Sequence, residues 1–412
     1  MNQISFKTYV QDDYIVKEAL TTIKNVPNVY FKFPKKVEDD LTDRADPFVY
    51  ALVFYMMQEG GTFEINGNVS KSVMDNITMF CRIWHIWEPQ RYKEVEIIAN
   101  EIKDDYRPEN RKMITAFSGG IDAAYTAYKY KKNLDKRFQY DLDRSVMILG
   151  ADISITNKKA FDLAFSKAKK MTDDLGIELI PVETNFRQYE SNWVHCFGTV
   201  IVAIFNFFSK KYFYGAAADD SVKHYHIPWG MNPITDRYLS SDTFRFIADG
   251  YEHSRIERTN VVKNWKACLE NLRVCWRNKE DLSSNCGHCE KCIRTKLDFF
   301  VLGVKNLPSM PKQFSPDEIA DKNLVDRRAL LDFYEESYDY GKENSSMSTE
   351  MLKLLKEQIN IWDKRICKKE NSLIIKLLKK QKNIWRERIN KKQNYLIFRL
   401  LKKQINFWRK RI

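Results

Sequence analysis

The ten residues TAFSGGIDAA, which begin at Thr115, constrain the fold of this chain more than any other stretch. A short apolar run over 113–117 is typical of a buried strand, and it ends abruptly in Ser118-Gly119-Gly120. Helix-compatible sequence follows from Asp122 to Tyr130. Glycines let the backbone approach a ligand closely, and the first N–H groups of a helix have no intrahelical partner. The sequence therefore predicts an anion-binding turn, and the absence of G-x-x-x-x-G-K-[ST] shows that it is not a Walker A loop.

Two side chains add to this predicted site. The hydroxyl of Ser118 can donate a hydrogen bond to an anion, and Asp122 can hold the Mg2+ that accompanies a triphosphate. The alternative is an ordinary turn between a strand and a helix, because glycine pairs are common in turns.

Ser-Gly-Gly-Ile-Asp after a strand resembles the PP-loop of the ATP pyrophosphatases, whose usual form is S-G-G-x-D-S. The resemblance implies that ATP binds with Mg2+, that a substrate is adenylated, and that pyrophosphate is released. It implies catalytic roles for Ser118 and Asp122. Ala123 stands where the family has its last serine, so one phosphate-facing hydroxyl is missing. The nucleotide contacts implied by the motif are Ala116, Phe117, Ser118, Gly119, Gly120, Ile121, Asp122 and Ala123.

From residue 112 onward, predicted strands alternate with predicted helices. This alternation predicts an α/β fold, with a Rossmann-like parallel sheet and helices on both faces. Ligands of such sheets bind beyond the carboxyl ends of the strands. By analogy with this fold, Gly150 and Asp152 are expected to contact the adenine and ribose of the nucleotide. The predicted strands are 113–117, 145–150, 178–182 and 212–218, and the predicted helices between them end near 132 or cover 157–175 and 194–208.

The chain of 412 residues is long enough for several domains. In the N-terminal part, 48–57 reads as a buried helix or strand, and 69–87 has apolar residues at helical spacing. The expected organisation is an α+β region at 1–110, a nucleotide-binding domain at 111–265, a zinc-binding helical subdomain at 266–340 and a basic helical tail at 350–412.

The formal charge of +13 is unevenly distributed. Residues 351–412 carry a net charge of +16, and the rest of the chain carries −3. Arguments for a nucleic-acid or membrane partner therefore concern the tail. The polar, acidic N-terminus lacks the features of a signal peptide, and no apolar stretch reaches the length of a transmembrane helix. These features predict a cytoplasmic protein, peripheral on the inner face of a membrane if the tail binds lipid.

Four cysteines follow the pattern C-x10-C-x2-C-x2-C, namely Cys275, Cys286, Cys289 and Cys292. Four thiolates at tetrahedral reach suit Zn2+ best, with an iron–sulfur cluster as the alternative. A site closed by four protein ligands is structural, because no coordination position remains open for a substrate.

The run NCGHCEKCIRT downstream of a PP-loop resembles 7-cyano-7-deazaguanine synthase and its relatives, over roughly 113–295. The resemblance implies ATP-dependent activation of a carboxylate for attack by ammonia, and a four-cysteine zinc site. Two details differ from the family pattern. The spacing before Cys286 is longer, and Arg294 comes one position earlier.

Two further segments are candidates for the site. The loop at 224–236 contains His224 and His226, and reads either as a structured surface loop or as a substrate-binding loop at the edge of the sheet. Arg255, in a charged segment, reads either as part of a solvated helix with Glu–Arg pairs or as a residue that neutralises phosphate charge. The resemblance favours a catalytic role for Arg255.

The tail contains an internal repeat of 23 residues, marked by Trp362, Trp385 and Trp408. In one straight helix, successive units would be about 140° out of phase. Separate amphipathic helices, broken near 391–394, are therefore expected. Three interpretations remain open: a helix on an anionic membrane surface, a nucleic-acid-binding segment, or a segment for helical packing or self-association. Trp at regular positions favours the membrane interface.

Together these features predict an enzyme that adenylates a small-molecule acceptor, a carboxylate by resemblance, before ammonia or another nucleophile attacks. One alternative is a nucleotide-binding module with weak or no catalysis, suggested by Ala123, which the basic tail recruits to a membrane or a partner. Another is a PP-loop enzyme that modifies tRNA and uses the tail to bind RNA.

Overall fold

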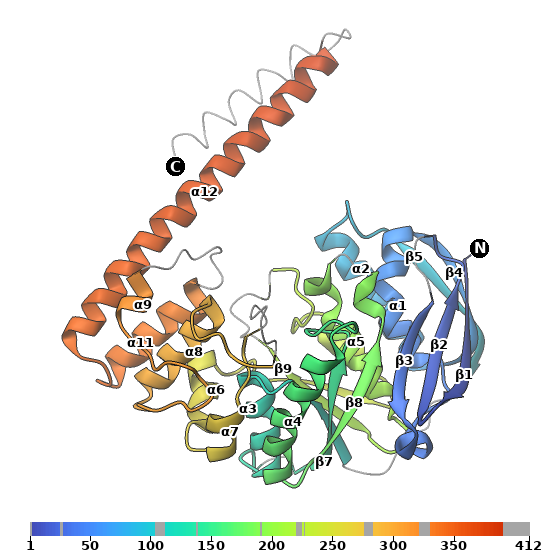
Figure 1. Ribbon diagram of the computed structural model, residues 1–412. Coiled ribbons are helices and arrows are strands. Elements are labelled where there is room, and N and C mark those ends of the chain that lie inside the picture. Colours follow the sequence, from blue (N-terminus) through green and yellow to red (C-terminus); the bar gives the residue numbers. More distant parts are fainter. Residues whose placement is uncertain are drawn as a thin grey trace.

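The strand that precedes the glycine turn lies inside a ten-stranded mixed sheet, two strands from one edge (Figure 1). The computed structural model describes residues 2–24, 28–103, 112–136, 139–189, 192–219, 225, 227–275, 283–320 and 330–389. In spatial order the strands are β10 (Arg245–Asp249), β9 (Tyr214–Ala218), β6 (Lys112–Ala116), β7 (Asp141–Leu149), β8 (Glu178–Thr184), β3 (Val29–Pro34), β2 (Tyr14–Thr21), β1 (Asn2–Gln11), β4 (Gly61–Ser70) and β5 (Val95–Lys103).

The five strands from β10 to β8 all run parallel. β6 comes first of these in the chain, β7 and β8 follow on one side of it, and β9 and β10 lie on the other. The strand order therefore reverses between β6 and β9. The predicted strands correspond to β6, β7, β8 and β9, with ends that differ by a few residues. β10 was outside the prediction, because its short run RFIAD follows a long loop without a regular pattern.

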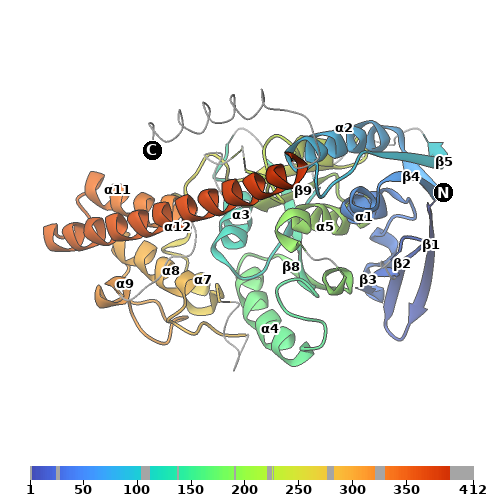
Figure 2. The same ribbon diagram turned by 90° about the horizontal axis from the view of Figure 1, so that it is seen from above.

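Helices cover both faces of this parallel half, as predicted (Figures 1 and 2). Met113 and Ile114 are neighbours in β6, and their side chains enter different hydrophobic cores because successive strand residues point to opposite faces. Met113 shares a core with α3 (Ile121–Lys131) and α4 (Lys158–Asp174). The core around Ile114 is formed with α1 (Asp46–Glu59), α2 (Lys71–Trp87) and α5 (Trp193–Phe207).

The N-terminal strands extend the same sheet. β3 pairs antiparallel with β8 through Phe31 and Thr184, so the sheet continues across the predicted boundary near residue 110. The apolar run at 48–57 is helical, in α1, and packs against α5, with the rings of Phe48 and Phe207 5.2 Å apart. β1, β2 and β3 form an antiparallel meander.

The segment after β10 is mainly helical and forms a third hydrophobic core (Figure 1). This core joins Ile256 and Leu297 to residues after position 300. The remaining helices of the described residues are η1 (Lys35–Asp40), η2 (Phe186–Gln188), η4 (Asp236–Leu239), α6 (Arg255–Val262), α7 (Lys266–Asn271), α8 (Glu290–Val301), α9 (Asp317–Ala320), η5 (Leu330–Glu335), α11 (Glu336–Glu343) and α12 (Thr349–Ile389).

α12 carries the first repeat unit of the tail and most of the second in one continuous helix. The expectation of separate helices is therefore wrong for these two units, while the predicted break near 391–394 lies outside the described residues. In the first unit, Met351, Leu355, Ile359, Trp362 and Ile366 are buried in the third core, with the rings of Trp362 and Tyr334 4.8 Å apart. The first unit thus packs within the chain. Trp408 also lies outside the described residues, and membrane or nucleic-acid binding by the rest of the tail stays a prediction.

Within the described residues, no helix combines the length and apolar character needed to cross a membrane.

Candidate functional site

The SGGID turn joins the carboxyl end of β6 to the start of α3. Pairing of β6 with β7 continues to Phe117, whose N–H donates to the carbonyl of Val146 at 2.8 Å. Gly119 has a φ of +79°, a conformation that favours glycine, and Gly120 is the N-cap residue of α3. No side chain of the described residues caps the first turn of α3, and Ser118 is exposed. The local structure is the predicted one. The N–H of Gly120 donates to the hydroxyl of Ser118 at 3.4 Å, and the N–H groups of the first turn of α3 are left to an anion.

The turn lies where the strand order reverses, between β6 and β9. In open parallel sheets, this is the position at which ligands bind beyond the carboxyl ends of the strands. Gly150 and Asp152 follow β7 at the same edge. Gly150 has a φ of +97°, and a Cβ there would lie 1.9 Å from the carbonyl oxygen of Thr184, so any larger residue would displace this turn.

Asp122 sits between two arginines of α6. Its carboxylate is 2.8 Å from the guanidinium of Arg258 and 3.3 Å from that of Arg255. Burial acts to raise the pKa of Asp122, but Arg258, Arg255 and more distant cations outweigh it and lower the pKa below its ordinary value. Asp122 is therefore ionised at neutral pH and holds both arginines at the start of α3.

Arg255 is almost completely buried, so the interpretation as a solvated helix is wrong for this residue. Its guanidinium also donates to the hydroxyl of Thr295 at 3.2 Å and lies 3.4 Å from the carboxylate of Asp298. Burial raises the pKa of Asp298 to about 7, although Arg255 and a hydrogen bond from Ser337 act against this. The predicted residues Asp122 and Arg255 thus meet across 133 positions of the chain.

Arg273 connects the glycine turn to the cysteine region. Its backbone N–H donates to the carbonyl of Gly119 at 2.8 Å, and its guanidinium donates to the carbonyl of Ser118 at 3.5 Å. Burial lowers the pKa of Arg273, while Asp152 and Cys275 act in the opposite direction. Arg273 therefore places a buried positive charge directly beside the turn.

α8 contributes two further cations, Lys291 and Arg294. Arg294 is buried, lies 3.4 Å from Glu290 and stacks 3.6 Å from the ring centre of Phe333. Burial, and then the charge of Arg294, lower the pKa of Lys291, while Asp152 acts to raise it. Together with Arg255, Arg258 and Arg273, these residues concentrate positive charge around the turn, which suits a ligand with several phosphate groups.

Three of these cations were missed from the sequence: Arg258, Arg273 and Lys291. Arg258 lies one helical turn after Arg255, and a helical reading of that segment would have placed both on one face. Arg273 precedes Cys275 by two positions, and Lys291 lies between Cys289 and Cys292. The sequence gives no sign that the cysteine segment approaches the glycine turn.

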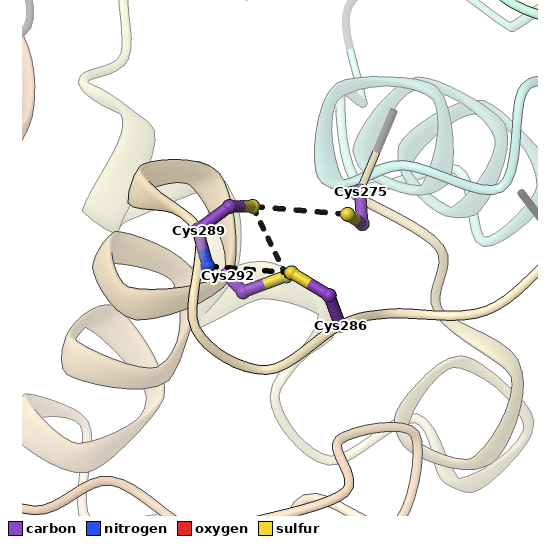
Figure 3. A group of neighbouring side chains, drawn as sticks. All are labelled: Cys275, Cys286, Cys289 and Cys292. Carbon is purple, nitrogen blue, oxygen red and sulfur yellow. Dashed lines mark hydrogen bonds between the residues drawn. The ribbon is translucent and has the colours of Figure 1, made fainter. Parts of the chain in front are cut away.

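The four predicted cysteines converge on one point (Figure 3). Their sulfur atoms all lie within 4.8 Å of one another, and the pairs 275–289, 286–292 and 289–292 are 3.7, 3.9 and 3.5 Å apart. A tetrahedral ion bound at about 2.3 Å holds its sulfurs about 3.8 Å apart. The spacing fits a single Zn2+, whereas an iron–sulfur cluster would hold the four sulfurs further apart.

The backbone around this cysteine centre explains the convergence. Gly287 has a φ of +76°, which turns the chain between Cys286 and Cys289. Cys289 is the N-cap residue of α8, so Cys292 lies in the first turn of that helix. Cys275 comes from a separate segment, earlier in the chain. The side chain of Asn285 holds this segment in place, because it accepts hydrogen bonds from the N–H groups of Val274 and Cys275 at 2.9 and 3.2 Å.

The predicted loop at 224–236 is described only in part. His224 and His226 lie outside the described residues. Trp229 donates to the carboxylate of Asp219 at 2.6 Å, and the carbonyl of Asp219 accepts a hydrogen bond from Arg258. The described part of this loop therefore reaches the edge of the sheet at which Asp122 lies.

A comparison of the chain with family models, with curated proteins and with solved structures gave no match.

Proposed function

We propose that this protein binds ATP at the SGGID turn and adenylates a carboxylate acceptor, with release of pyrophosphate. The observation that carries the proposal is the position of Asp122. It begins α3, directly after the glycine turn, and pairs with Arg255 and Arg258 where the strand order reverses. The amides at the start of α3, an ionised carboxylate and buried guanidinium groups together suit a polyphosphate and its counter-ion.

Each part of the site has a role in this proposal. The amides of Gly119 and Gly120 and the first turn of α3 would bind the β- and γ-phosphates, with the hydroxyl of Ser118 as a further donor. Arg255 and Arg258 would neutralise phosphate charge. Asp122 would hold Mg2+, which supplies charge neutralisation when bound. Catalysis of this kind depends mainly on positioning and on electrostatic stabilisation.

The proposed reaction has two steps. A carboxylate oxygen of the acceptor attacks the α-phosphorus of ATP, the bond from this phosphorus to the bridging oxygen breaks, and pyrophosphate leaves. Ammonia or another nucleophile then attacks the acyl carbon, AMP leaves with the bonding electrons, and the nucleophile loses a proton. Gly150 and Asp152 lie at the same edge and would contact the nucleoside.

Zn2+ at the cysteine centre would have a structural role in this proposal. Four sulfurs leave no position for a substrate, so the metal would fix the loop that carries Arg273 and the start of α8.

We expect ATP–pyrophosphate exchange when the protein is incubated with Mg-ATP, labelled pyrophosphate and a panel of carboxylates. Exchange reports the first step alone, because adenylation is reversible and needs no nucleophile. Adding ammonia should then give stoichiometric AMP and pyrophosphate. The exposed Asp75 gives a matched control, since Asp75→Asn changes one charge in α2, away from the site. Formation of ADP and phosphate in place of AMP would contradict the proposal.

The second candidate function is nucleotide binding with little or no catalysis, and Ala123 is the observation that favours it. Ala123 lies in the first turn of α3 and is partly exposed, so a serine fits there. If the site is catalytic, Ala123→Ser should raise turnover, by up to roughly tenfold for one added hydrogen bond to phosphate. If both forms bind ATP and neither turns it over with any carboxylate, the binding function is favoured.

A further inference from the structure

α8 begins at the cysteine centre, and one of its sides contacts Arg255 of α6. Thr295 and Asp298 both contact Arg255, which in turn pairs with Asp122. Lys291 precedes Thr295 by four residues and Asp298 by seven, so it lies on the same side of the helix, one turn closer to the N-terminus. Thr295, Asp298 and Lys291 therefore lie on one face of α8.

The ammonium of Lys291 is half-buried and has no ion-pair partner among the described residues. Its charge interacts with the carboxylates of Asp122 and Asp152 and with the guanidinium groups of Arg255 and Arg294. The guanidinium groups repel the ammonium of Lys291 despite these two carboxylates, so an anion that binds between the cations is stabilised. Lys291 thus lies on the face of α8 that carries the contacts to Arg255, a position suited to a phosphate ligand.

The segment that carries Cys275 also contacts the glycine turn. Arg273 precedes Cys275 by two residues, and its N–H bonds to Gly119 within the turn itself. The two segments that hold the four cysteines therefore each place one cation beside the turn, Arg273 before Cys275 and Lys291 between Cys289 and Cys292.

We propose that Lys291 binds the pyrophosphate part of the nucleotide, and that the metal-bound cysteine centre sets phosphate affinity by fixing Lys291 and Arg273 against the glycine turn. This inference rests on the proposed function and assigns to the metal centre a part in ligand binding. The ligands that bind Lys291 are those with a pyrophosphate group, namely ATP and inorganic pyrophosphate. AMP, which lacks this group, does not bind it.

The test is calorimetric titration of the full chain with inorganic pyrophosphate, ATP and AMP, with zinc content measured for each variant. Lys291→Met should weaken binding of pyrophosphate and ATP by roughly tenfold or more, as expected for a charge-assisted hydrogen bond, and leave AMP affinity unchanged. Lys291→Arg should restore most of the lost affinity. Lys266→Met is the matched control, because the Lys266 side chain is 88% exposed.

Wild-type protein stripped of zinc should lose at least as much pyrophosphate affinity as Lys291→Met, and regain it when zinc is restored. Equal pyrophosphate binding by Lys291→Met and Lys266→Met at full zinc content would overturn the role of Lys291. Unchanged affinity of the zinc-free protein would overturn the role of the metal centre. If wild-type protein bound neither pyrophosphate nor ATP, the proposed function itself would fail, so the two failures are distinguishable.

Discussion

Asp122→Asn is expected to lower ATP turnover by roughly 10²- to 10³-fold, the usual cost of losing one electrostatic contact to the transition state. Binding of pyrophosphate without Mg2+, in contrast, should not be weakened by this change. The carboxylate of Asp122 now offsets the charges of Arg255 and Arg258, at 3.3 and 2.8 Å. Without it, the positive potential at the turn rises, so pyrophosphate should bind in the absence of Mg2+ at least as tightly as it binds to the wild type.

The measurements are steady-state AMP formation over a range of Mg2+ concentrations and titration with pyrophosphate in a chelator. Asp75→Asn should behave like the wild type in both, since it removes a charge of the same sign from an exposed position. A variant Asp122→Asn that turns over normally and keeps its Mg2+ dependence would show that this carboxylate only orients the arginines.

Cys289→Ser should have the second large effect. Cys289 supplies one of the four converging sulfurs and is also the N-cap residue of α8. Mutation of a residue that only hydrogen-bonds to a metal ligand already lowers metal affinity by up to about 100-fold. Loss of the ligand itself should therefore lower zinc affinity by at least about 100-fold. Because α8 carries Thr295 and Asp298, loosening its start should also weaken pyrophosphate binding.

Zinc content after dialysis and thermal unfolding curves, with and without added zinc, measure this effect. Cys367→Ser is the matched control, because Cys367 lies on α12, outside the cysteine centre. The prediction is wrong if Cys289→Ser retains one tightly bound zinc per chain and wild-type affinity for pyrophosphate.

Two buried carboxyl groups make the stability of the fold depend on pH. Burial raises the pKa of both Asp236 and Asp298 to about 7, above the value of an unfolded chain. Each folded carboxyl group retains its proton where the unfolded group has lost it, so the stability present at acid pH decreases as the pH rises toward 7. Pairing of Asp298 with Arg255 connects this behaviour to the candidate site.

The strand, the glycine turn and the helix start were all predicted, because each depends on neighbours in the sequence. The run at 113–117 is apolar and followed by two glycines, and the structure places β6, the turn and α3 accordingly. The four cysteines were found for the same reason, since three of them lie within seven residues and a turn at Gly287 suffices to bring them together.

The N-terminal region shows where local patterns stop being informative. The strands β1 and β2 lack a strict apolar alternation, and the place of β3 in the sheet depends on the edge that β8 offers through Thr184. The tail shows the same limit in another way. Its first two units share one helix, but only a neighbour such as Tyr334 determines that Trp362 of the first unit becomes buried.

The sequence by itself determined the anion-binding turn and the metal-ligand set, because short-range spacing and residue type are sufficient for both. Only the tertiary structure decided which charges surround the turn. Arg273 reaches Ser118 across 155 positions, and Arg255 reaches Asp122 across 133. Such contacts depend on the packing of α6 against α3 and of the segment after α7 against the glycine turn, and no local pattern in the sequence predicts that packing.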